Sequence, residues 1–391
     1  MTTILFVDDD RDVLDGMRRR FRRARSDWEL AFAGGGQEAL DLLGHEPVDV
    51  IVSDIRMPGV DGIALLQRVR ETHPDIARIV LTGYAEPAQE RAAFAVCHRF
   101  LPKPCDPDVL VATIDQACQV RALLTDGTIR GLVGSLERLP SLPSVFMRVR
   151  AQLDDDRSDA ASVAGVIEED TVLAATVLRA ANSALFAPAN PIQRVRDAVS
   201  YLGRRMIGHI VLGATSVDQF AKLGVPSYFL RGFQAHSAAT ADLAGRLVPK
   251  GARDDAFAAG LLHDIGQLVL MVTLGDRYEE IVDAAHEKRK PLVEVELEAL
   301  GATHDQVGAY LLGLWGLPWS IIAAVAGHHG GGALSAAPVD AATARAARIA
   351  ELVTATKAGK AVHHGAFEEL DLTREERVTI ERWRASFRGG I

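Results

Sequence analysis

Cysteine is scarce in this chain of 391 residues, which has three. Cys97, Cys105 and Cys118 lack the spacing of metal ligands, and their odd number leaves one thiol without a pairing partner. We therefore expect reduced thiols and a cytoplasmic protein. A signal peptide is missing, and no apolar run reaches the length that spans a bilayer. We therefore expect no membrane association.

Excess positive charge is also absent, because the formal net charge is −9. This balance argues against a surface built mainly for nucleic acid. One basic run, residues 18–25, is expected to be the solvated face of a helix. The chain shows neither a basic recognition helix in helix-turn-helix spacing nor the glycine-rich nucleotide box of a histidine kinase. We expect no direct DNA binding.

The length of the chain exceeds what one hydrophobic core holds and predicts several domains. Apolar runs at 4–7, 48–53 and 78–81 alternate with helical patterns, which predicts a doubly wound α/β unit with a parallel, flavodoxin-like sheet. After residue 129 the strand patterns stop and no fixed repeat appears, so the remainder is predicted to be an all-α helical bundle.

Four segments are therefore expected along the chain. They are an α/β domain at 1–122, a hinge at 123–130, a helical domain at 131–340 and a helical extension at 341–391. The extension is predicted to contain one amphipathic helix, Leu370 through Phe387, which either packs on the bundle or mediates a homodimer.

Polar side chains follow the ends of the predicted strands. Asp8 and Asp9 follow the first strand, Asp54 and Thr82 follow the next two, and Lys103 lies in a later LPKP segment. Because the carboxyl ends of parallel strands share one edge, we expect these groups to converge. Three close carboxylates favour Mg²⁺, and Lys103 would receive phosphoryl oxygens. Asp54 is the predicted nucleophile for an acyl phosphate, with an ordinary flavodoxin-like domain as the alternative.

The segments FVDDD, SDIRMPG, LTGY and LPKP resemble the receiver domain of bacterial two-component response regulators. The resemblance implies that Asp8 and Asp9 bind Mg²⁺ and that Asp54 accepts phosphate from a sensor histidine kinase. It also implies roles for four further residues: Arg56 (backbone carbonyl to the metal), Thr82 and Lys103 (phosphate sensing) and Phe100 (switch aromatic).

Histidine gives a second signal, because several of the twelve fall inside apolar helical stretches. The candidates are His236, His263 beside Asp264, His304 and the pair His328 and His329, with Glu351 as a closing carboxylate. Imidazole and carboxylate bind zinc, iron and manganese, and helix bundles build such sites in their cores.

Geometry on a helix limits what the paired histidines do together. Neighbouring residues point about 100° apart, so we expect His328 and His329 to serve two ions, or one of them to lie outside the ligand set. The alternative is a structural role for each histidine. Thr303 to Gln306 fits a capping box around His304, and histidines at a helix C-terminus interact favourably with its dipole.

Residues 130–340 resemble an HDOD domain, a relative of the HD metal-dependent phosphohydrolases. The resemblance is carried by LPSLPSVFMRV, VLRAANSALF, AVSYLG, GLLHDIGQLVL and the stretch from His304 to His329. It implies ligand positions at His236, His263, Asp264, His304, His328 and His329, with Glu351 the weakest match. HD-GYP phosphodiesterases, which cleave cyclic di-GMP, have Gly-Tyr-Pro after the histidine pair, where this chain has GGGALSAAP.

Two functions are consistent with these features. In the first, the chain is a response regulator in which phosphorylation of Asp54 rearranges Thr82 and Phe100, and the HDOD domain binds a protein partner or a nucleotide second messenger. In the second, it is a metal-dependent phosphodiesterase acting on cyclic di-GMP or another cyclic nucleotide. We favour the first function; a redox-active metal without hydrolysis would indicate a ligand or oxygen sensor instead.

Overall fold

The computed structural model describes residues 2–24, 27–73, 75–83, 92–93, 96–122, 143–330, 338–357 and 370–386. It contains two compact units. Residues Met1–Ser144 with Tyr310–Leu317 form the first unit, and Val145–Ala309 with Pro318–Ile391 form the second. The predicted hinge at 123–130 lies outside the described residues.

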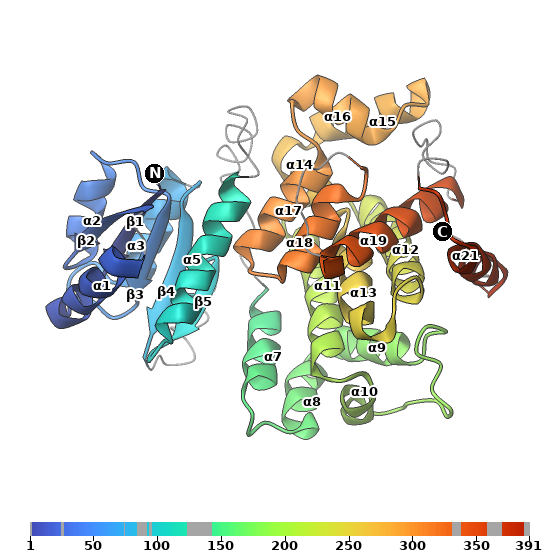
Figure 1. Ribbon diagram of the computed structural model, residues 1–391, viewed down its shortest axis with the longest axis horizontal. Helices are drawn as coiled ribbons and strands as arrows, with labels where there is room; N and C mark the ends of the chain where they lie inside the picture. Colours follow the sequence, from blue (N-terminus) through green and yellow to red (C-terminus); the bar gives the residue numbers. More distant parts are fainter. Residues whose placement is uncertain are drawn as a thin grey trace. The chain divides into compact units, whose positions relative to one another are not determined.

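The first unit is a parallel sheet with helices beside it, as the sequence predicted (Figure 1). Its five strands have the order β2-β1-β3-β4-β5, which puts β3 at the centre. The strands are β1 (Thr2–Val7), β2 (Trp28–Ala33), β3 (Val50–Asp54), β4 (Ala77–Thr82) and β5 (Arg99–Pro102). The helices are α1 (Arg11–Ala24), α2 (Gly36–Leu43), α3 (Gly62–Thr72) and α5 (Pro107–Ala122).

Burial explains which strands the sequence revealed. The three inner strands are covered on both faces, and their apolar residues are almost completely buried. They therefore appear as continuous apolar runs. β2 lies at an edge and is partly exposed along its length, and β5 has four residues, so neither gives a strong apolar signal.

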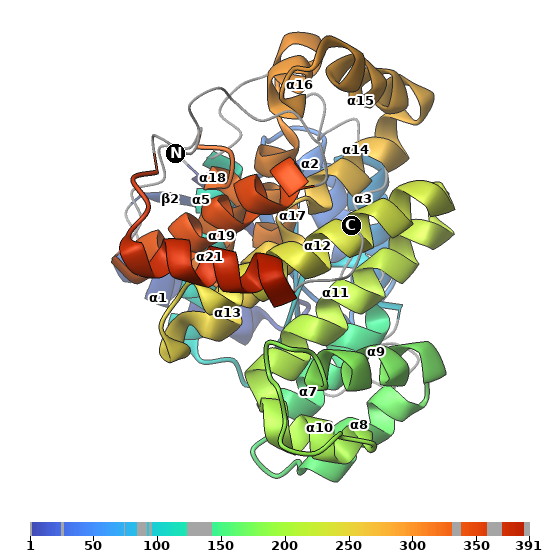
Figure 2. The same cartoon turned by 90° about the vertical axis from the view of Figure 1, so that its right-hand side faces the viewer.

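The second unit is all-α, in agreement with the prediction (Figure 2). Its first helices are α7 (Ser144–Asp154), α8 (Ala160–Glu168), α9 (Thr171–Ala181), α10 (Val195–Leu202), α11 (Arg204–Lys222), α12 (Ser227–Arg246), η1 (Lys250–Ala252), α13 (Arg253–Leu262) and α14 (Ile265–Leu274). They are followed by α15 (Asp276–Lys288), α16 (Leu292–Leu300), α17 (His304–Leu314), α18 (Trp319–Gly327), α19 (Pro338–Lys357) and α21 (Arg374–Ser386). Ser144 at the start of α7 and the end of α17, from Tyr310 onward, are assigned to the first unit.

The centre of the second unit is built from α12, α13, α18 and α19, which pack against one another. Glycine allows two close approaches in this region. A Cβ atom at Gly260 would lie 2.8 Å from the Ala241 Cα, and one at Gly266 would lie 1.9 Å from the His304 carbonyl oxygen. The helix pairs α12–α13 and α14–α17 therefore meet backbone to backbone.

One helical stretch, Lys250–Leu274, is long and apolar enough to cross a membrane by length and composition, contrary to our expectation. It comprises η1, α13 and α14, and 72% of its apolar window is buried inside the protein. A buried core helix has the same composition, so burial accounts for the apolar character of this stretch.

The C-terminal helix begins later than predicted, at Arg374 instead of Leu370. The reason is a capping box: the Thr373 hydroxyl accepts from the Glu376 N–H at 3.2 Å, and the Glu376 carboxylate accepts from the Thr373 N–H at 2.7 Å. Trp383 is 1% exposed and donates to Asp242 on α12 at 2.9 Å. α21 therefore packs on the bundle, and Phe387 lies outside the described residues.

Candidate functional site

Three carboxylates meet at the carboxyl edge of the sheet in the first unit. Asp54 ends β3, and Asp8 and Asp9 follow β1 directly. One oxygen of each residue lies within 4.8 Å of the others. Asp8 is buried, Asp54 is half-buried and Asp9 is exposed, so the group opens to solvent on one side. Carboxylate oxygens in this arrangement suit Mg²⁺.

Lys103 joins this acidic group from the end of β5. Its Nζ donates to Asp8 Oδ2 at 2.7 Å and to Asp54 Oδ2 at 2.9 Å. Burial alone would lower the pKa of Lys103, but the hydrogen bonds and charges of the two carboxylates outweigh it and raise that pKa. Lys103 therefore stays cationic beside Asp54.

Hydrogen bonds of Ile55 and of Gly62, at the start of α3, fix the segment that carries Asp54. The Ile55 N–H donates to Asp54 Oδ1 at 2.6 Å, and the Gly62 N–H donates to the Ile55 carbonyl at 2.8 Å. A Cβ atom at Gly62 would lie 1.9 Å from the Asp54 carbonyl oxygen, so the residue at this position must be glycine.

The remaining receiver residues are placed less completely. Arg56 is exposed in the loop two residues after Asp54, and Phe100 is partly buried against the core of the sheet. Thr82 ends β4, but its side chain lies outside the described residues. The carbonyl role of Arg56 and the switch roles of Thr82 and Phe100 stay predictions.

The seven predicted ligands of the second unit come together in two groups. Within each group, ligand atoms lie within 4.8 Å of one another. The first group is Asp264, His304, His328 and His329, and the second is His236, His263 and Glu351. Six of the seven side chains are buried, and His329 is half-buried. These residues come from α12, the α13–α14 junction, α17, the end of α18 and α19.

Asp264 lies between the two groups. Its Oδ1 is 3.1 Å from His304 Nε2 and 3.6 Å from His328 Nε2. Its Oδ2 is 3.3 Å from His263 Nε2 and 3.6 Å from His236 Nε2. Because each oxygen faces a different group, Asp264 would supply one ligand atom to each group if ions were bound.

Backbone carbonyls orient two of the imidazoles. His263 Nδ1 donates to the Gly260 carbonyl at 2.9 Å, and His328 Nδ1 donates to the Val325 carbonyl at 2.6 Å. A carbonyl only accepts, so Nδ1 carries the proton and Nε2 faces the centre. His328 Nε2 is buried and finds no hydrogen-bond partner among the described residues. A buried nitrogen of this kind fits a metal ion.

The charges of the centre are strongly coupled. Burial lowers the pKa of His263, but Asp264 and Glu351 outweigh it and raise that pKa to about 9. Burial has the opposite effect on the Glu351 carboxyl group and raises its pKa. His236 and His263 outweigh burial and hold that pKa well below its usual range. Without an ion, protons on imidazole therefore balance the carboxylates, and a bound cation would take over that role.

His328 and His329 lie closer together than their spacing on a helix suggested, and how they share ions stays a prediction. Both fall in one group of ligand atoms, just after α18 ends at Gly327. Their ring centroids are 4.1 Å apart. His329 Nε2 lies 3.0 Å from His304 Nε2. Burial, followed by the neighbouring His328 and His304, holds the pKa of His329 well below its usual range.

Glu296 contacts the centre through His304, Tyr278 in turn contacts Glu296, and the sequence reasoning missed both. Glu296 is completely buried and accepts hydrogen bonds from His304 and from the Tyr278 hydroxyl. A signal was present, since Glu296 lies one helical turn before the buried Leu300 and one after the half-buried Leu292 on α16. The neighbouring acids, half-buried Glu294 and exposed Glu298, conceal it.

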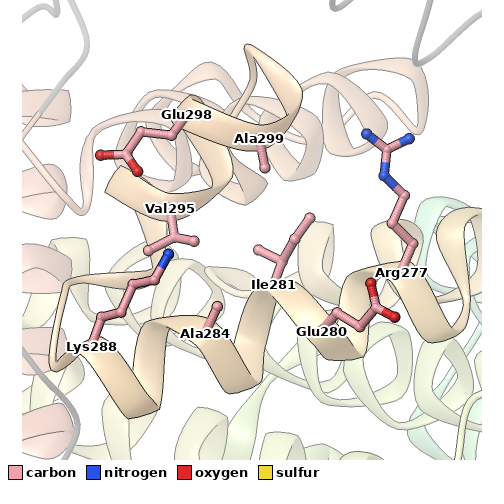
Figure 3. A pocket seen from close by; sticks show the side chains of 8 residues that line it. All are labelled: Arg277, Glu280, Ile281, Ala284, Lys288, Val295, Glu298 and Ala299. Atoms are coloured by element: carbon pink, nitrogen blue, oxygen red, sulfur yellow. The ribbon is translucent and has the colours of Figure 1, made fainter.

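A surface pocket of about 340 Å³ lies elsewhere, between α15 and α16 (Figure 3). Ile281 and Val295 point toward each other between the helices, and charged side chains stand around them. Its lining residues are Arg277, Glu280, Ile281, Ala284, Lys288, Val295, Glu298 and Ala299. No member of the two ligand groups lines this pocket. The histidine centre, rather than the pocket, is therefore the candidate site of this unit.

The fold and the two sites together define a receiver unit followed by a helical unit of the HD type. The response regulator receiver domain model matches residues 4–115, and the HDOD domain model matches residues 139–330. The chain therefore belongs to the proteins that join a receiver domain to an HDOD domain.

Known proteins match parts of the chain. The hydrogenase transcriptional regulatory protein HoxA of Cupriavidus necator is 36% identical over 126 residues, which cover 32% of this chain and 26% of HoxA. The DNA-binding transcriptional regulator NtrC of Klebsiella pneumoniae is 41% identical over 87 residues, covering 21% and 18%. The chain thus spans about a quarter or less of these two regulators.

Solved structures match both units. The crystal structure of an HDOD domain protein with unknown function from Geobacter sulfurreducens is 24% identical, with a TM-score of 0.48, and the match covers 64% of this chain and 90% of that one. The signal receiver domain of an HD domain-containing protein from Pseudomonas fluorescens is 30% identical, with a TM-score of 0.29, covering 31% and 97%.

Proposed function

We propose that this protein is a phosphorylation-dependent response regulator of the cytoplasm, in which Asp54 accepts a phosphoryl group from a sensor histidine kinase. The observation that supports this role is the pair of hydrogen bonds from Lys103 Nζ to Asp8 and Asp54, at 2.7 and 2.9 Å. They place a cation beside the carboxylate that would receive the phosphoryl group.

The residues of the site divide the chemistry between them. An Asp54 carboxylate oxygen attacks phosphorus, and the bond between phosphorus and the donor's nitrogen breaks. Lys103 then exchanges its bond to the Asp54 carboxylate for one to a phosphoryl oxygen. Mg²⁺, which Asp8, Asp9, Asp54 and the Arg56 carbonyl would hold, supplies positive charge for the phosphoryl oxygens when bound.

The output of the switch is assigned to the HDOD domain. Rearrangement of Thr82 and Phe100 would change the surface of the receiver, and the HDOD domain would bind a protein partner or a nucleotide second messenger accordingly. The absence of Gly-Tyr-Pro after the paired histidines supports binding over hydrolysis of cyclic di-GMP.

The test of this proposal uses the full chain with acetyl phosphate and Mg²⁺. Wild-type protein should gain one phosphoryl group by intact mass, and its binding of fluorescent cyclic di-GMP or of a protein from the same cell should change with phosphorylation. Phosphorylation of a site other than Asp54, mapped after borohydride trapping, would contradict the proposal.

A second function, metal-dependent phosphodiester hydrolysis, is favoured by the position of Asp264 between two ligand groups. The mixture of imidazole and carboxylate fits iron, manganese or zinc. His304, His328, His329 and Asp264 would hold one ion, and His236, His263, Glu351 and Asp264 the other. Such ions supply Lewis acidity for hydrolysis when bound.

Elemental analysis and turnover assays separate the two functions. Purified full-length protein would be tested for metal and for hydrolysis of cyclic di-GMP and cyclic mononucleotides. Metal without turnover supports a regulatory or sensing centre. Turnover that disappears in Asp264→Asn supports the phosphodiesterase, and a redox-active metal that responds to oxygen supports a sensor.

A further inference from the structure

Glu296 is a fully buried carboxylate that contacts the histidine centre through His304. Both of its oxygens are used. Oε2 accepts from the His304 backbone N–H at 2.9 Å and from His304 Nδ1 at 2.7 Å, and Oε1 accepts from the Tyr278 hydroxyl at 2.6 Å. Tyr278 is also completely buried. Glu296 therefore has a fixed orientation, because each oxygen is held by a separate donor.

These bonds set the orientation of the His304 ring. An ionised carboxylate only accepts hydrogen bonds, so the His304 Nδ1 must carry a proton. The other nitrogen, Nε2, then faces the centre, 3.1 Å from Asp264 Oδ1 and 3.0 Å from His329 Nε2. The backbone bond to the same oxygen fixes the position of the helix start that carries His304.

His304 differs in this respect from its neighbours in the centre. The Nδ1 atoms of His263 and His328 face backbone carbonyls, whereas that of His304 faces a carboxylate. A carboxylate behind an imidazole orients it more strongly and increases its basicity as a metal ligand. Glu296 thus adds a third buried carboxyl group to those of Asp264 and Glu351.

We infer that Glu296, held by Tyr278, is a positioning residue that keeps His304 Nε2 directed into the centre as a metal ligand. The inference rests on the proposed metal centre, but it does not require hydrolysis. Glu296 acts through His304 and contacts no other member of the two ligand groups in the hydrogen bonds described.

The chain offers a matched control on the same helix. Glu298 is two residues away on α16 and lines the surface pocket in Figure 3. Its side chain is 60% exposed and pairs with Lys290. Glu298→Gln removes the same charge from the same helix without touching His304.

The experiment compares Glu296→Gln, Tyr278→Phe and Glu298→Gln in the full chain with two readouts. The first is Mn²⁺ affinity by calorimetry. The second is the imidazole Nδ1–H resonance of His304 in metal-free protein labelled with ¹⁵N-histidine, assigned by its loss in His304→Gln. Glu296→Gln should weaken Mn²⁺ binding by about 10- to 100-fold and shift the Nδ1–H resonance. Tyr278→Phe should change both less, and Glu298→Gln should change neither.

The readouts separate this inference from the proposed metal centre. If wild-type protein binds no Mn²⁺, the metal centre is wrong, and the Nδ1–H resonance alone decides whether Glu296 holds His304. An unchanged resonance in Glu296→Gln, or wild-type Mn²⁺ affinity in that variant, would overturn the inference. If circular dichroism shows that Glu296→Gln does not fold, Tyr278→Phe is the deciding variant. A lower Tm with an unchanged His304 Nδ1–H resonance in Tyr278→Phe would show that the Tyr278–Glu296 pair has only a structural role.

Discussion

Raising the pH should destabilise the HDOD domain when the protein is free of metal. The group responsible is His263, whose pKa is raised from 6.5 to about 9 by Asp264 and Glu351 against the opposing effect of burial. The native state therefore holds this proton more tightly than the unfolded chain. The stabilisation is complete below pH 6.5 and is lost as the pH rises through about 9.

The magnitude follows from the difference between the two pKa values. At 1.36 kcal/mol for each pH unit of pKa, a rise from 6.5 to about 9 corresponds to about 3 kcal/mol. Solvent does not reduce this value much, because His263 is 0% exposed. For a domain of this size, about 3 kcal/mol lowers Tm by roughly 6–12 °C.

Other members of the centre do not cancel this loss. The pKa of His329 is held well below its usual range, so this residue destabilises the native state at low pH. That effect disappears as the pH rises above about 6.5. The pKa of Glu351 is also lowered, so its contribution is constant above its ordinary range. Burial lowers the pKa of His304, but Glu296 and Asp264 outweigh it and raise that pKa well above its usual value. His304 therefore adds a loss in the same direction as the pH rises above 6.5.

The assay is thermal unfolding of full-length protein in chelator, followed by circular dichroism from pH 6.5 to 9. The control is His263→Gln, which should lack the part of the decrease that comes from this proton. Equal Tm values for wild-type protein at both ends of the range would refute the reasoning, as would an equal decrease in the variant. With Mn²⁺ present the trend should reverse, because a bound ion displaces the protons and binds more tightly as the pH rises.

Three further outcomes follow from single contacts. Asp54→Asn should gain no phosphoryl group from acetyl phosphate on a phosphate-affinity gel; retained labelling would contradict the assignment. Asp264→Asn should lose both ions by elemental analysis, because its oxygens face separate groups, and loss of only one would argue against bridging. Gly266→Ala places Cβ 1.9 Å from the His304 oxygen and should cost about 3 kcal/mol or more in urea unfolding. Its control is Gly165→Ala at an exposed position of α8, where a Cβ meets nothing within 4 Å and should stabilise by about 0.5–1 kcal/mol. Equal unfolding midpoints for the two variants would contradict the packing at Gly266.

The sequence revealed the fold where burial is two-sided. β1, β3 and β4 are covered on both faces, so their apolar runs stood out. β2 and β5 are the edge strands, and their exposed or short sequences hid them. The helical unit was readable because strand patterns stop after residue 129, whereas the start of α21 depended on the capping box at Thr373.

The ligand types of the histidine centre were readable, but their grouping was not. Histidine and aspartate within apolar helices indicate a site, because buried polar groups need partners. The two oxygens of Asp264 face different groups, and this arrangement depends on the packing of helices that are distant in sequence. The placement of His328 and His329 depends on α18 ending at Gly327. The glycines that follow the pair predict that the helix ends nearby, but they do not predict the residue at which it ends.

Stability alone does not require the residues of this centre. Asp264, Glu296 and Glu351 are each at most 4% exposed, and burying charge is costly even when it is paired. Apolar residues of similar volume would often hold a helix bundle as well or better. The pairing here is specific, since each carboxylate faces imidazole nitrogens while His328 Nε2 is left with no hydrogen-bond partner among the described residues. A binding surface for a protein partner does not need such a buried arrangement, whereas converging imidazole and carboxylate groups suit an ion. Metal content is therefore the property to measure before either output is assigned.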